Sequence, residues 1–462
     1  MGAPSTLRVG QRLQASIDRL VFQGSGLGRL PDGRVLFVPY SAPGDLAEVE
    51  VTDARDDFVR ADLVRILTPS PLRAAPPCPY FANCGGCQWQ HLEYPSQLHW
   101  KREILRELLV RVGKLGGVSV ATPLALASPW GYRSRAQLKV VTGTASGAAS
   151  GGAGLHIGFH QRETRRVVDI DRCPLLDARL NGVLRTLRHM RDPGLHKLFP
   201  RLREVWLAAG SGTGAGAGAG TGEVIVSLFA RTQDRAAIRL LFHRIQAEER
   251  GLQGVVLLDG DPRQHPRLVD RHGHGAITEV VGQHRFRVDA TAFFQVNGQA
   301  AEMLTRLVIE GAALTGTERV LDLYCGVGTF TVPLARQARE VVGIESNAAA
   351  AADAQHNLRA NGVTGARVVQ AQAEQVLPSL EQGGPWDLVV LDPPRQGCSR
   401  RVLEAMSGMA VPRVIYVSCD PSTLARDLGI LVRAGYRCRS VQPVDLFPQT
   451  FHLESVALLE RS

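Results

Sequence analysis

Three cysteines stand close together near residue 80. Cys78, Cys84 and Cys87 lie in the stretch CPYFANCGGC, with five residues between the first two and two between the last two. Such close thiols are typical of a metal site, and thiolate-bound metals in proteins usually take four ligands. Gly85 and Gly86 permit a tight turn that leaves backbone N–H groups free to face the bound group. With a fourth thiolate from elsewhere, an iron–sulfur cluster and a zinc ion both fit, and the residues alone leave the two open.

A second kind of cysteine chemistry is predicted at Cys419, which ends the apolar run VIYVS and precedes a helical pattern. A thiol between a strand end and a helix N-terminus is expected to have a lowered pKa, although a buried structural cysteine is the usual alternative. Glu454 opens the last apolar run, ESVALLE. A thiol nucleophile and a carboxylate base on opposite sides of one flipped base suit the methylation of uracil at C5.

A nucleotide-binding loop is predicted by VLDLYCGVGTF, in which an apolar strand is followed by Gly326-x-Gly328 and a helix. The glycines let the backbone pass close beneath a ligand. Glu345 ends the next apolar run, 17 residues beyond Gly328, where a carboxylate can accept hydrogen bonds from both ribose hydroxyls. Asp322 precedes the loop, and the third glycine of the dinucleotide fingerprint is missing. The pattern resembles the S-adenosylmethionine site of class I methyltransferases, with an NAD site as the alternative.

The motif VVLDPPRQG places Asp392 after a further apolar strand, at the carboxyl edge of the predicted sheet. It resembles the Asp-Pro-Pro-aromatic motif of enzymes that methylate exocyclic base amines, but Arg395 replaces the aromatic residue. An exocyclic-amine nucleic-acid methyltransferase is therefore an alternative, and it would need neither Cys419 nor Glu454.

The elements that position these residues predict a multidomain α/β protein. Residues 6–66 read as short strands between Gly and Pro turns, which indicates a small OB-like β-barrel. Residues 67–285 mix strand-like runs with helical patterns around the cysteine motif, which indicates an α+β domain. The helix at 96–114 is a candidate to pack on the C-terminal domain instead. Residues 286–462 alternate helices and apolar strands, as in the Rossmann-like sheet of class I methyltransferases.

Two glycine-rich tracts, residues 142–154 and 208–222, are expected to be enlarged loops without a packed core. The N-terminus lacks the apolar segment of a secretory signal, and no apolar stretch approaches the roughly 20 residues of a membrane span. We therefore expect a cytoplasmic protein with no membrane partner.

Basic charge is concentrated in the middle of the chain. The formal net charge is +9, and residues 67–285 alone hold 29 Lys and Arg against 17 Asp and Glu, a net +12. Such an uneven excess is typical of a surface that binds nucleic acid. Arg133, Arg135 and Lys139, in the run YRSRAQLK, are candidate phosphate contacts.

Nearly the whole chain resembles the RNA uracil-C5-methyltransferase family, and within it the branch that acts on 23S ribosomal RNA. Residues 6–66 resemble the family's TRAM domain, and DATAFFQVN resembles its signature ahead of the catalytic domain. The resemblance implies Cys419 as the nucleophile and Glu454 as the general base. The contacts that it implies for S-adenosyl-L-methionine are Gln295, Tyr324, Gly326, Gly328, Thr329, Glu345, Gln372 and Asp392.

The resemblance also implies a fourth ligand for the cysteine motif. It predicts a [4Fe-4S] cluster on Cys78, Cys84, Cys87 and Cys173, the last in a Cys-Pro pair. A structural role is expected, because methyl transfer moves no net electrons. The expected partner is RNA, with 23S rRNA favoured and tRNA as the alternative, and the expected state is a monomer. A non-catalytic RNA-binding iron–sulfur protein is the remaining alternative, but it would need neither the cofactor loop nor the catalytic pair.

Overall fold

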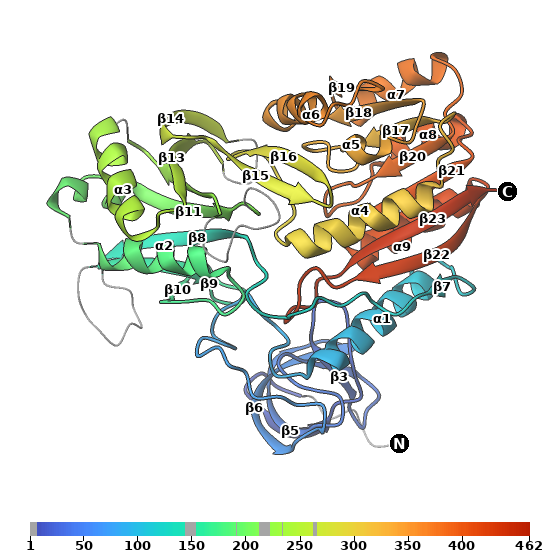
Figure 1. The fold of residues 1–462 in the computed structure, drawn as a ribbon. Coiled ribbons are helices and arrows are strands. Elements are labelled where there is room, and N and C mark those ends of the chain that lie inside the picture. The colour runs from blue at the N-terminus through green and yellow to red at the C-terminus, as the bar shows by residue number, and fades with distance from the viewer. Residues whose placement is uncertain (1–6, 144–153, 191, 212–221, 233, 262–265) are drawn as a thin grey trace.

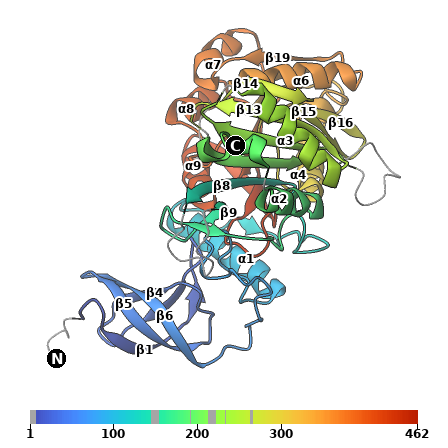
Figure 2. The same ribbon diagram turned by 90° about the vertical axis from the view of Figure 1, so that its left-hand side faces the viewer.

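The chain forms three parts in the computed structural model: a small β-barrel, a central part and a C-terminal part, each built on its own large sheet (Figure 1). Figure 2, turned by 90°, shows the barrel set apart below the other two. In the described residues, no helix is long and apolar enough to cross a membrane. Most of both glycine-rich tracts lies outside these residues. The structure describes residues 7–143, 154–190, 192–211, 222–232, 234–261 and 266–462.

The N-terminal barrel is one sheet that closes on itself. Its strands are β1 (Arg12–Ser16), β2 (Arg19–Leu20), β3 (Gly26–Arg29), β4 (Val35–Val38), β5 (Leu46–Ala54) and β6 (Phe58–Thr68). The sheet order is β1-β5-β6-β4-β3-β2, so both edges belong to one short segment of the chain. Alternate residues of β5 are buried, among them Val49 and Val51, and they pack with Leu36 and Val59 inside the barrel. This period of two follows from the side-chain alternation of a strand with one buried face.

The segment after the barrel returns to the C-terminal part. The elements concerned are α1 (Tyr94–Arg111), β7 (Ser119–Val120), α9 (Pro421–Arg433) and β22 (Tyr436–Val444). Leu105 and Leu109 of α1 are buried in the same core as Leu428 of α9, and the two helices are in contact. β7 pairs in parallel with β22 at the edge of the C-terminal sheet. This early segment is therefore bound to the C-terminal part rather than to the central part that follows it.

The central part is a sheet covered on both faces. Its elements are β8 (Arg135–Gly143), β9 (Gly154–His160), β10 (Val167–Asp169), α2 (Ala178–His189), η1 (Pro193–Leu195), η2 (Phe199–Arg201), β11 (Leu202–Ala209), β12 (Val224–Ala230), α3 (Arg235–Glu248), β13 (Leu252–Asp259) and β14 (Arg267–Gly273). The order is β10-β9-β8-β11-β12-β13-β14. Leu184 of α2 and Leu241 of α3 fill one core, whereas Phe229 packs on the other face with residues of the C-terminal part. Every residue of β12 is accordingly buried.

A β-hairpin joins the central and C-terminal parts. It consists of β15 (Ala276–Val281) and β16 (His284–Asp289), and it packs on α6 (Ala348–Ala360). The Asn357 side chain accepts a hydrogen bond from the Arg287 N–H at 2.7 Å. The hairpin spans the boundary that we placed between residues 285 and 286.

The C-terminal part is a doubly wound sheet. Its further elements are α4 (Gly298–Ala312), β17 (Arg319–Leu323), α5 (Thr331–Leu334), β18 (Glu340–Glu345), β19 (Ala366–Gln370), α7 (Ala373–Gln382), β20 (Leu388–Leu391), α8 (Arg400–Gly408), β21 (Arg413–Ser418) and β23 (Glu454–Arg461). The order is β19-β18-β17-β20-β21-β23-β22-β7, with β17 to β21 parallel and β23 antiparallel to β21. The carboxyl ends of the parallel strands and the start of β23 therefore share one edge. The strand order reverses beside β17, and ligands of such sheets bind at this switch point.

Candidate active site

Cys419 and Glu454 are brought together by the pairing of β21 with β23. Ser418 lies opposite Ser455 in the antiparallel register, so Cys419 directly follows one partner and Glu454 directly precedes the other. Residues at these positions face each other across an antiparallel pair. Glu454 is only 3% exposed, and Cys419 is half-buried. A thiol and a carboxyl group thus meet at the edge of the sheet where ligands bind.

The protonation of this edge is set mainly by burial. Burial, with the nearby Asp392 carboxylate, raises the pKa of Glu454 to about 8. Burial also raises the pKa of Asp392 to about 7. The pKa of the Cys419 thiol rises to about 12, because burial acts together with the charges of Glu454 and Asp392. The prediction of a lowered pKa for Cys419 is therefore wrong for the protein without RNA.

The helix that follows Cys419 does not offset this burial. Asp420 caps α9 and accepts hydrogen bonds from the N–H groups of Ser422 and Thr423 at 2.9 and 3.0 Å. The positive end of the helix is thereby satisfied by a carboxylate rather than by a thiolate. In the described part of the chain, neither the Asp392 nor the Glu454 carboxylate accepts a hydrogen bond.

The sequence did not indicate the roles of Arg395 and His452 near this edge, nor the exposure of Phe293. The exposed Arg395 opposes the rise in the pKa of both Cys419 and Glu454. Burial and nearby cations, Arg395 among them, lower the pKa of His452 to about 3, so this side chain is neutral at physiological pH. Phe293 is 69% exposed, which is unusual for an aromatic side chain. Arg395 stood out in the sequence only as a departure from the Asp-Pro-Pro-aromatic motif, and Phe293 lies within DATAFFQVN.

The loop after β17 adopts a backbone that glycine favours. Tyr324, Gly326 and Gly328 all have positive φ, of 65°, 55° and 88°. The Gly326 N–H donates to the Glu345 carboxylate at 2.9 Å, which fixes this side chain beside the loop. A Cβ added at Gly326 would meet no atom within 4 Å, so the loop is open on that side. The backbone here thus leaves room for a ligand to approach.

Asp322 supplies a buried acceptor beneath this loop. Its Oδ2 accepts a hydrogen bond from the Thr331 hydroxyl at 2.6 Å, whereas Oδ1 is buried without a partner among the described residues. Burial raises the pKa of Asp322 to about 7. A buried polar atom without a partner is rare in folded proteins, and at a switch point it fits a ligand that donates a hydrogen bond.

The other predicted cofactor contacts are spread over three segments. Thr329 is half-buried and follows the glycine loop, and Gln372 is exposed in the turn between β19 and α7. Gln295 is half-buried in the segment between β16 and α4. The neighbouring Val296 carbonyl accepts hydrogen bonds from the Ser134 N–H at 2.7 Å and the Ser134 hydroxyl at 3.0 Å. The Gln295 segment is therefore held by the central part.

The cysteine loop, residues 78–87, lies against the central sheet and near Cys173. The Gly85 N–H donates to the His160 carbonyl at 2.9 Å. The Tyr80 hydroxyl donates to Asp171, two residues before Cys173, at 2.7 Å. These contacts connect the loop with the segment that holds the fourth predicted ligand.

The four cysteines form no disulfide, and the pKa values of Cys84 and Cys87 respond to the others. Burial raises the pKa of Cys84 to about 11 and that of Cys87 to about 12, and the neighbouring cysteines contribute to both shifts. The thiols are therefore near neighbours. Across the described residues, however, no group of three or more His, Cys, Asp or Glu side chains is arranged so that it could hold a metal ion.

Two of the three candidate phosphate contacts are occupied by carboxylates. Lys139 forms an ion pair with Glu204 at 2.5 Å. Arg135 is paired with Glu279 at 3.5 Å, and its side chain is 15% exposed. The predicted phosphate contact is therefore wrong for Arg135, because this side chain faces the inside of the molecule.

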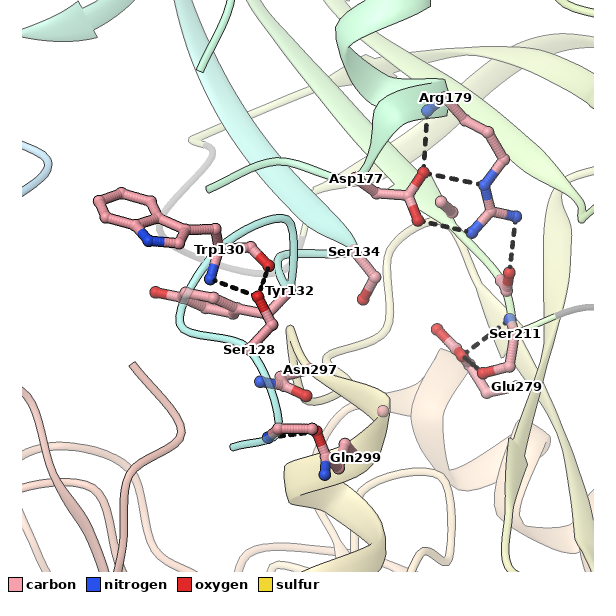
Figure 3. A pocket seen from close by; sticks show the side chains of 14 residues that line it. Ser128, Trp130, Tyr132, Ser134, Asp177, Arg179, Ser211, Glu279, Asn297 and Gln299 are labelled. Atoms are coloured by element: carbon pink, nitrogen blue, oxygen red, sulfur yellow. Dashed lines mark hydrogen bonds and ion pairs between the residues drawn. The ribbon is translucent and has the colours of Figure 1, made fainter. Parts of the chain in front are cut away.

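A separate pocket of about 280 Å³ lies between the central and C-terminal parts (Figure 3). Arg179 donates to both oxygens of Asp177, at 3.0 and 2.9 Å, and Ser211 donates to the buried Glu279. Asn297, which caps α4, also lines the pocket. Neither Cys419 nor Glu454 lines it, so this pocket is distinct from the candidate active site.

Known proteins resemble two parts of this chain and nearly its whole length. The family model described as tRNA (uracil-5-)-methyltransferase matches residues 276–462, and that of the TRAM domain matches residues 7–64. An uncharacterized RNA methyltransferase of Gloeobacter violaceus is 38% identical over 99% of this chain and 98% of its own length. Another, of Halalkalibacterium halodurans, is 35% identical over 97% of this chain and 96% of its own.

Among solved structures, the chain is similar to a tRNA (uracil-54, C5)-methyltransferase of Pyrococcus abyssi, crystallised with S-adenosyl-L-homocysteine. The two are 26% identical, with a TM-score of 0.71 over 96% of this chain and 100% of that one. The doubly wound C-terminal part thus has a methyltransferase fold, preceded by a TRAM domain. The chain belongs to the RNA uracil-C5-methyltransferase family, and it is an S-adenosylmethionine-dependent enzyme.

Proposed function

We propose that this enzyme methylates C5 of uracil in RNA by covalent catalysis, with Cys419 as the nucleophile and Glu454 as the general base. The observation that carries the proposal is the opposition of these two residues across β21 and β23, beside Asp392. C5 of uracil is a poor nucleophile, and a thiolate at C6 makes it reactive. An enzyme that methylates exocyclic base amines would need neither Cys419 nor Glu454.

In the proposed reaction, the half-buried Cys419 thiol loses its proton to solvent, its sulfur bonds to C6 of a flipped uracil, and the C5–C6 π electrons move onto the O4 oxygen, which turns the ring into an enolate. S-adenosylmethionine, when bound, would supply the methyl group to C5, and its sulfonium sulfur would become a neutral thioether. The Glu454 carboxylate then removes the C5 proton. The electron pair of the C5–H bond forms the C5–C6 double bond, and the C6–S bond breaks. A base with a pKa of about 8 suits this last step near neutral pH.

We infer that S-adenosylmethionine lies over the open side of the Gly326–Gly328 loop. Glu345, which the Gly326 N–H fixes beside the loop, would accept hydrogen bonds from the ribose hydroxyls, and the unpaired Oδ1 of Asp322 would accept one from the ammonium group of the methionine part. Tyr324, Thr329, Gln295 and Gln372 would be the further contacts, and Asp392 would lie between cofactor and target base, as the family resemblance implies. The exposed ring of Phe293 is available to stack on an RNA base.

We propose a [4Fe-4S] cluster on Cys78, Cys84, Cys87 and Cys173. Their thiols are near neighbours, and none of them forms a disulfide. Binding would require all four thiols to lose their protons and draw together, because they do not yet form a metal-binding group. Protein purified without oxygen should be brown and contain about four irons per chain. Stoichiometric zinc without visible absorbance would contradict the cluster.

For the substrate we propose 23S rRNA, on the resemblance to that branch of the family, with tRNA as the second candidate. The likeness to the Pyrococcus abyssi tRNA methyltransferase over 96% of the chain favours the second. Mass spectrometric mapping of 5-methyluridine in RNA from cells with and without the gene tests both. Loss of 5-methyluridine from 23S rRNA alone is expected, loss from tRNA alone would replace the substrate, and no loss from either would reject the function.

A further inference from the structure

The loop that leads into Glu454 has an unusual backbone. We name residues 445–453, which join β22 to β23, the base loop, because Glu454 is the next residue. Gln449, near its middle, has a φ of 69° and is 2% exposed. A residue other than glycine adopts this left-handed conformation only where its surroundings impose it, at a cost of about 1–3 kcal/mol. Something outside the loop must therefore hold it.

Gln97 of α1 contacts Gln449 through both ends of its side-chain amide. The Gln97 Oε1 accepts the Gln449 N–H at 2.8 Å, and the Gln97 Nε2 donates to the Gln449 Oε1 at 3.0 Å. Gln97 is fully buried, and its Nε2 also donates to the carbonyls of Trp89 and Leu92 at 3.1 and 3.0 Å. The carbonyl of Gln449 accepts from the N–H groups of Gln88 and Trp89 at 3.1 and 3.0 Å. One glutamine thus ties the base loop to the segment that follows the cysteine loop.

The first half of the base loop is held from the same face of α1. Lys101, one helical turn after Gln97, forms a fully buried ion pair with Asp445 at 2.6 Å. Its ammonium group also donates to the Phe447 carbonyl at 3.0 Å. Two further contacts join this half to residues outside the loop: the Tyr132 hydroxyl donates to the Pro448 carbonyl at 3.0 Å, and the Asp445 N–H donates to the Leu124 carbonyl at 2.9 Å.

Glu454 has no comparable hold of its own. In the described part of the chain, its carboxylate accepts no hydrogen bond. The position of Glu454 is therefore set by the backbone on either side of it, which is the base loop before it and β23 after it. Cys419 differs, because it follows β21 and precedes α9, and neither element is part of the base loop.

We propose that Gln97 is a positioning residue that holds the base loop through Gln449 and thereby places Glu454 for removal of the C5 proton. This inference rests on the proposed role of Glu454. A general base must lie within hydrogen-bond reach of its proton, and a misplacement of about 1 Å costs about 100-fold in rate. Weakening this hold should therefore slow the release of methylated RNA and spare the addition of Cys419.

The test follows a single turnover of the full-length protein with unmodified RNA from cells that lack the gene and with S-adenosylmethionine carrying a labelled methyl group. Gln97→Met keeps the length of the side chain and removes its hydrogen bonds. The labelled protein–RNA adduct should form at a rate close to that of the wild type and decay at least 10-fold more slowly.

Two further variants separate positioning from folding. Arg102→Met, on the same helix, removes two hydrogen bonds to the Val120 carbonyl, at 3.0 and 2.8 Å, that do not involve the base loop. This matched control should release RNA normally. Gln449→Gly keeps the left-handed backbone and removes only the side chain. It should slow release less than Gln97→Met, and it decides the question if Gln97→Met does not fold.

Glu454→Gln, measured in parallel, separates the two hypotheses. If Glu454→Gln accumulates the adduct but Gln97→Met and Gln449→Gly release RNA like the wild type, the positioning inference is wrong and the proposed function stands. If Gln97→Met lowers adduct formation and release equally, Gln97 has only a structural role. If Glu454→Gln turns over normally, Glu454 is not the base and the inference is overturned with it.

Discussion

Two groups of polar side chains lie around the base loop, and they differ in how well they are paired. In the first group, Gln97 uses both ends of its amide and Lys101 pairs with the Asp445 carboxylate. In the second group, the carboxylates of Asp392 and Glu454 lie near each other, and burial raises both pKa values toward neutrality. Well-paired buried groups specify a structure, whereas poorly paired ones cost stability and mark functional sites. The first group therefore holds the loop, and the second is available for chemistry.

The largest effect is expected for Cys419→Ala. It should abolish methylation and form no adduct with RNA, because the enolate cannot form without the sulfur at C6. A denaturing gel with labelled cofactor measures both. Cys325→Ala and Cys398→Ala are the controls, since both thiols are buried near the cofactor edge, and they should keep adduct formation. An adduct in Cys419→Ala, or its loss in either control alone, would reject Cys419 as the nucleophile.

The next effect is expected for Glu454→Gln. The amide cannot take the C5 proton, so addition and methylation should proceed while release slows by about 100-fold to 10,000-fold. A denaturation-resistant protein–RNA band that carries the labelled methyl group should therefore accumulate. Normal turnover would assign the proton to another base and leave only the Cys419 half of the mechanism.

Local sequence patterns indicate the glycine loop and Glu345, but they do not indicate the contacts that hold the base loop. The Gly326–Gly328 loop and Glu345 follow directly from short apolar strands that alternate with helices, a pattern that local sequence encodes. The hold on the base loop depends on Gln97 and Gln449, which lie 352 residues apart. No local pattern connects two such glutamines.

Burial explains the two predictions that the structure overturns. The lowered pKa of Cys419 was inferred from its place before a helix, but Asp420 caps that helix and two carboxylates lie nearby. Arg135 is a predicted phosphate contact, but it pairs with the buried Glu279 of strand β15. In both cases the deciding partner is fixed by tertiary packing, and one sequence does not show it.

The well-paired group is tested by Lys101→Met, which leaves Asp445 buried without its partner. Removing one member of a buried ion pair typically costs about 3–5 kcal/mol in the free energy of unfolding. Urea denaturation should show this loss. Arg106→Met, on the same helix but in the exposed pair with Glu103, should cost less than about 1 kcal/mol. Equal effects of the two variants would mean that the Lys101–Asp445 pair does not hold the loop.

In the poorly paired group, Glu454→Gln should have the smallest effect on the free energy of unfolding. It should stabilise the protein at high pH, whereas Lys101→Met should destabilise it. The pKa of Glu454 is about 8 in the folded protein, above its value of 4.5 in the unfolded chain. Between these values the folded protein retains a proton that the unfolded chain has lost, so stability should fall as the pH rises from about 5 to 8. Glu454→Gln cannot titrate, and this part of the pH dependence should disappear. A tenfold change in a protonation equilibrium corresponds to about 1.4 kcal/mol, so we expect the variant to match the wild type at pH 5 and to exceed it by roughly 1–3 kcal/mol at pH 8. Urea denaturation of both proteins across this range measures the difference. A difference in the free energy of unfolding that stays constant with pH would mean that the folded protein does not keep Glu454 protonated. The contrast between the well-paired and the poorly paired group would then disappear.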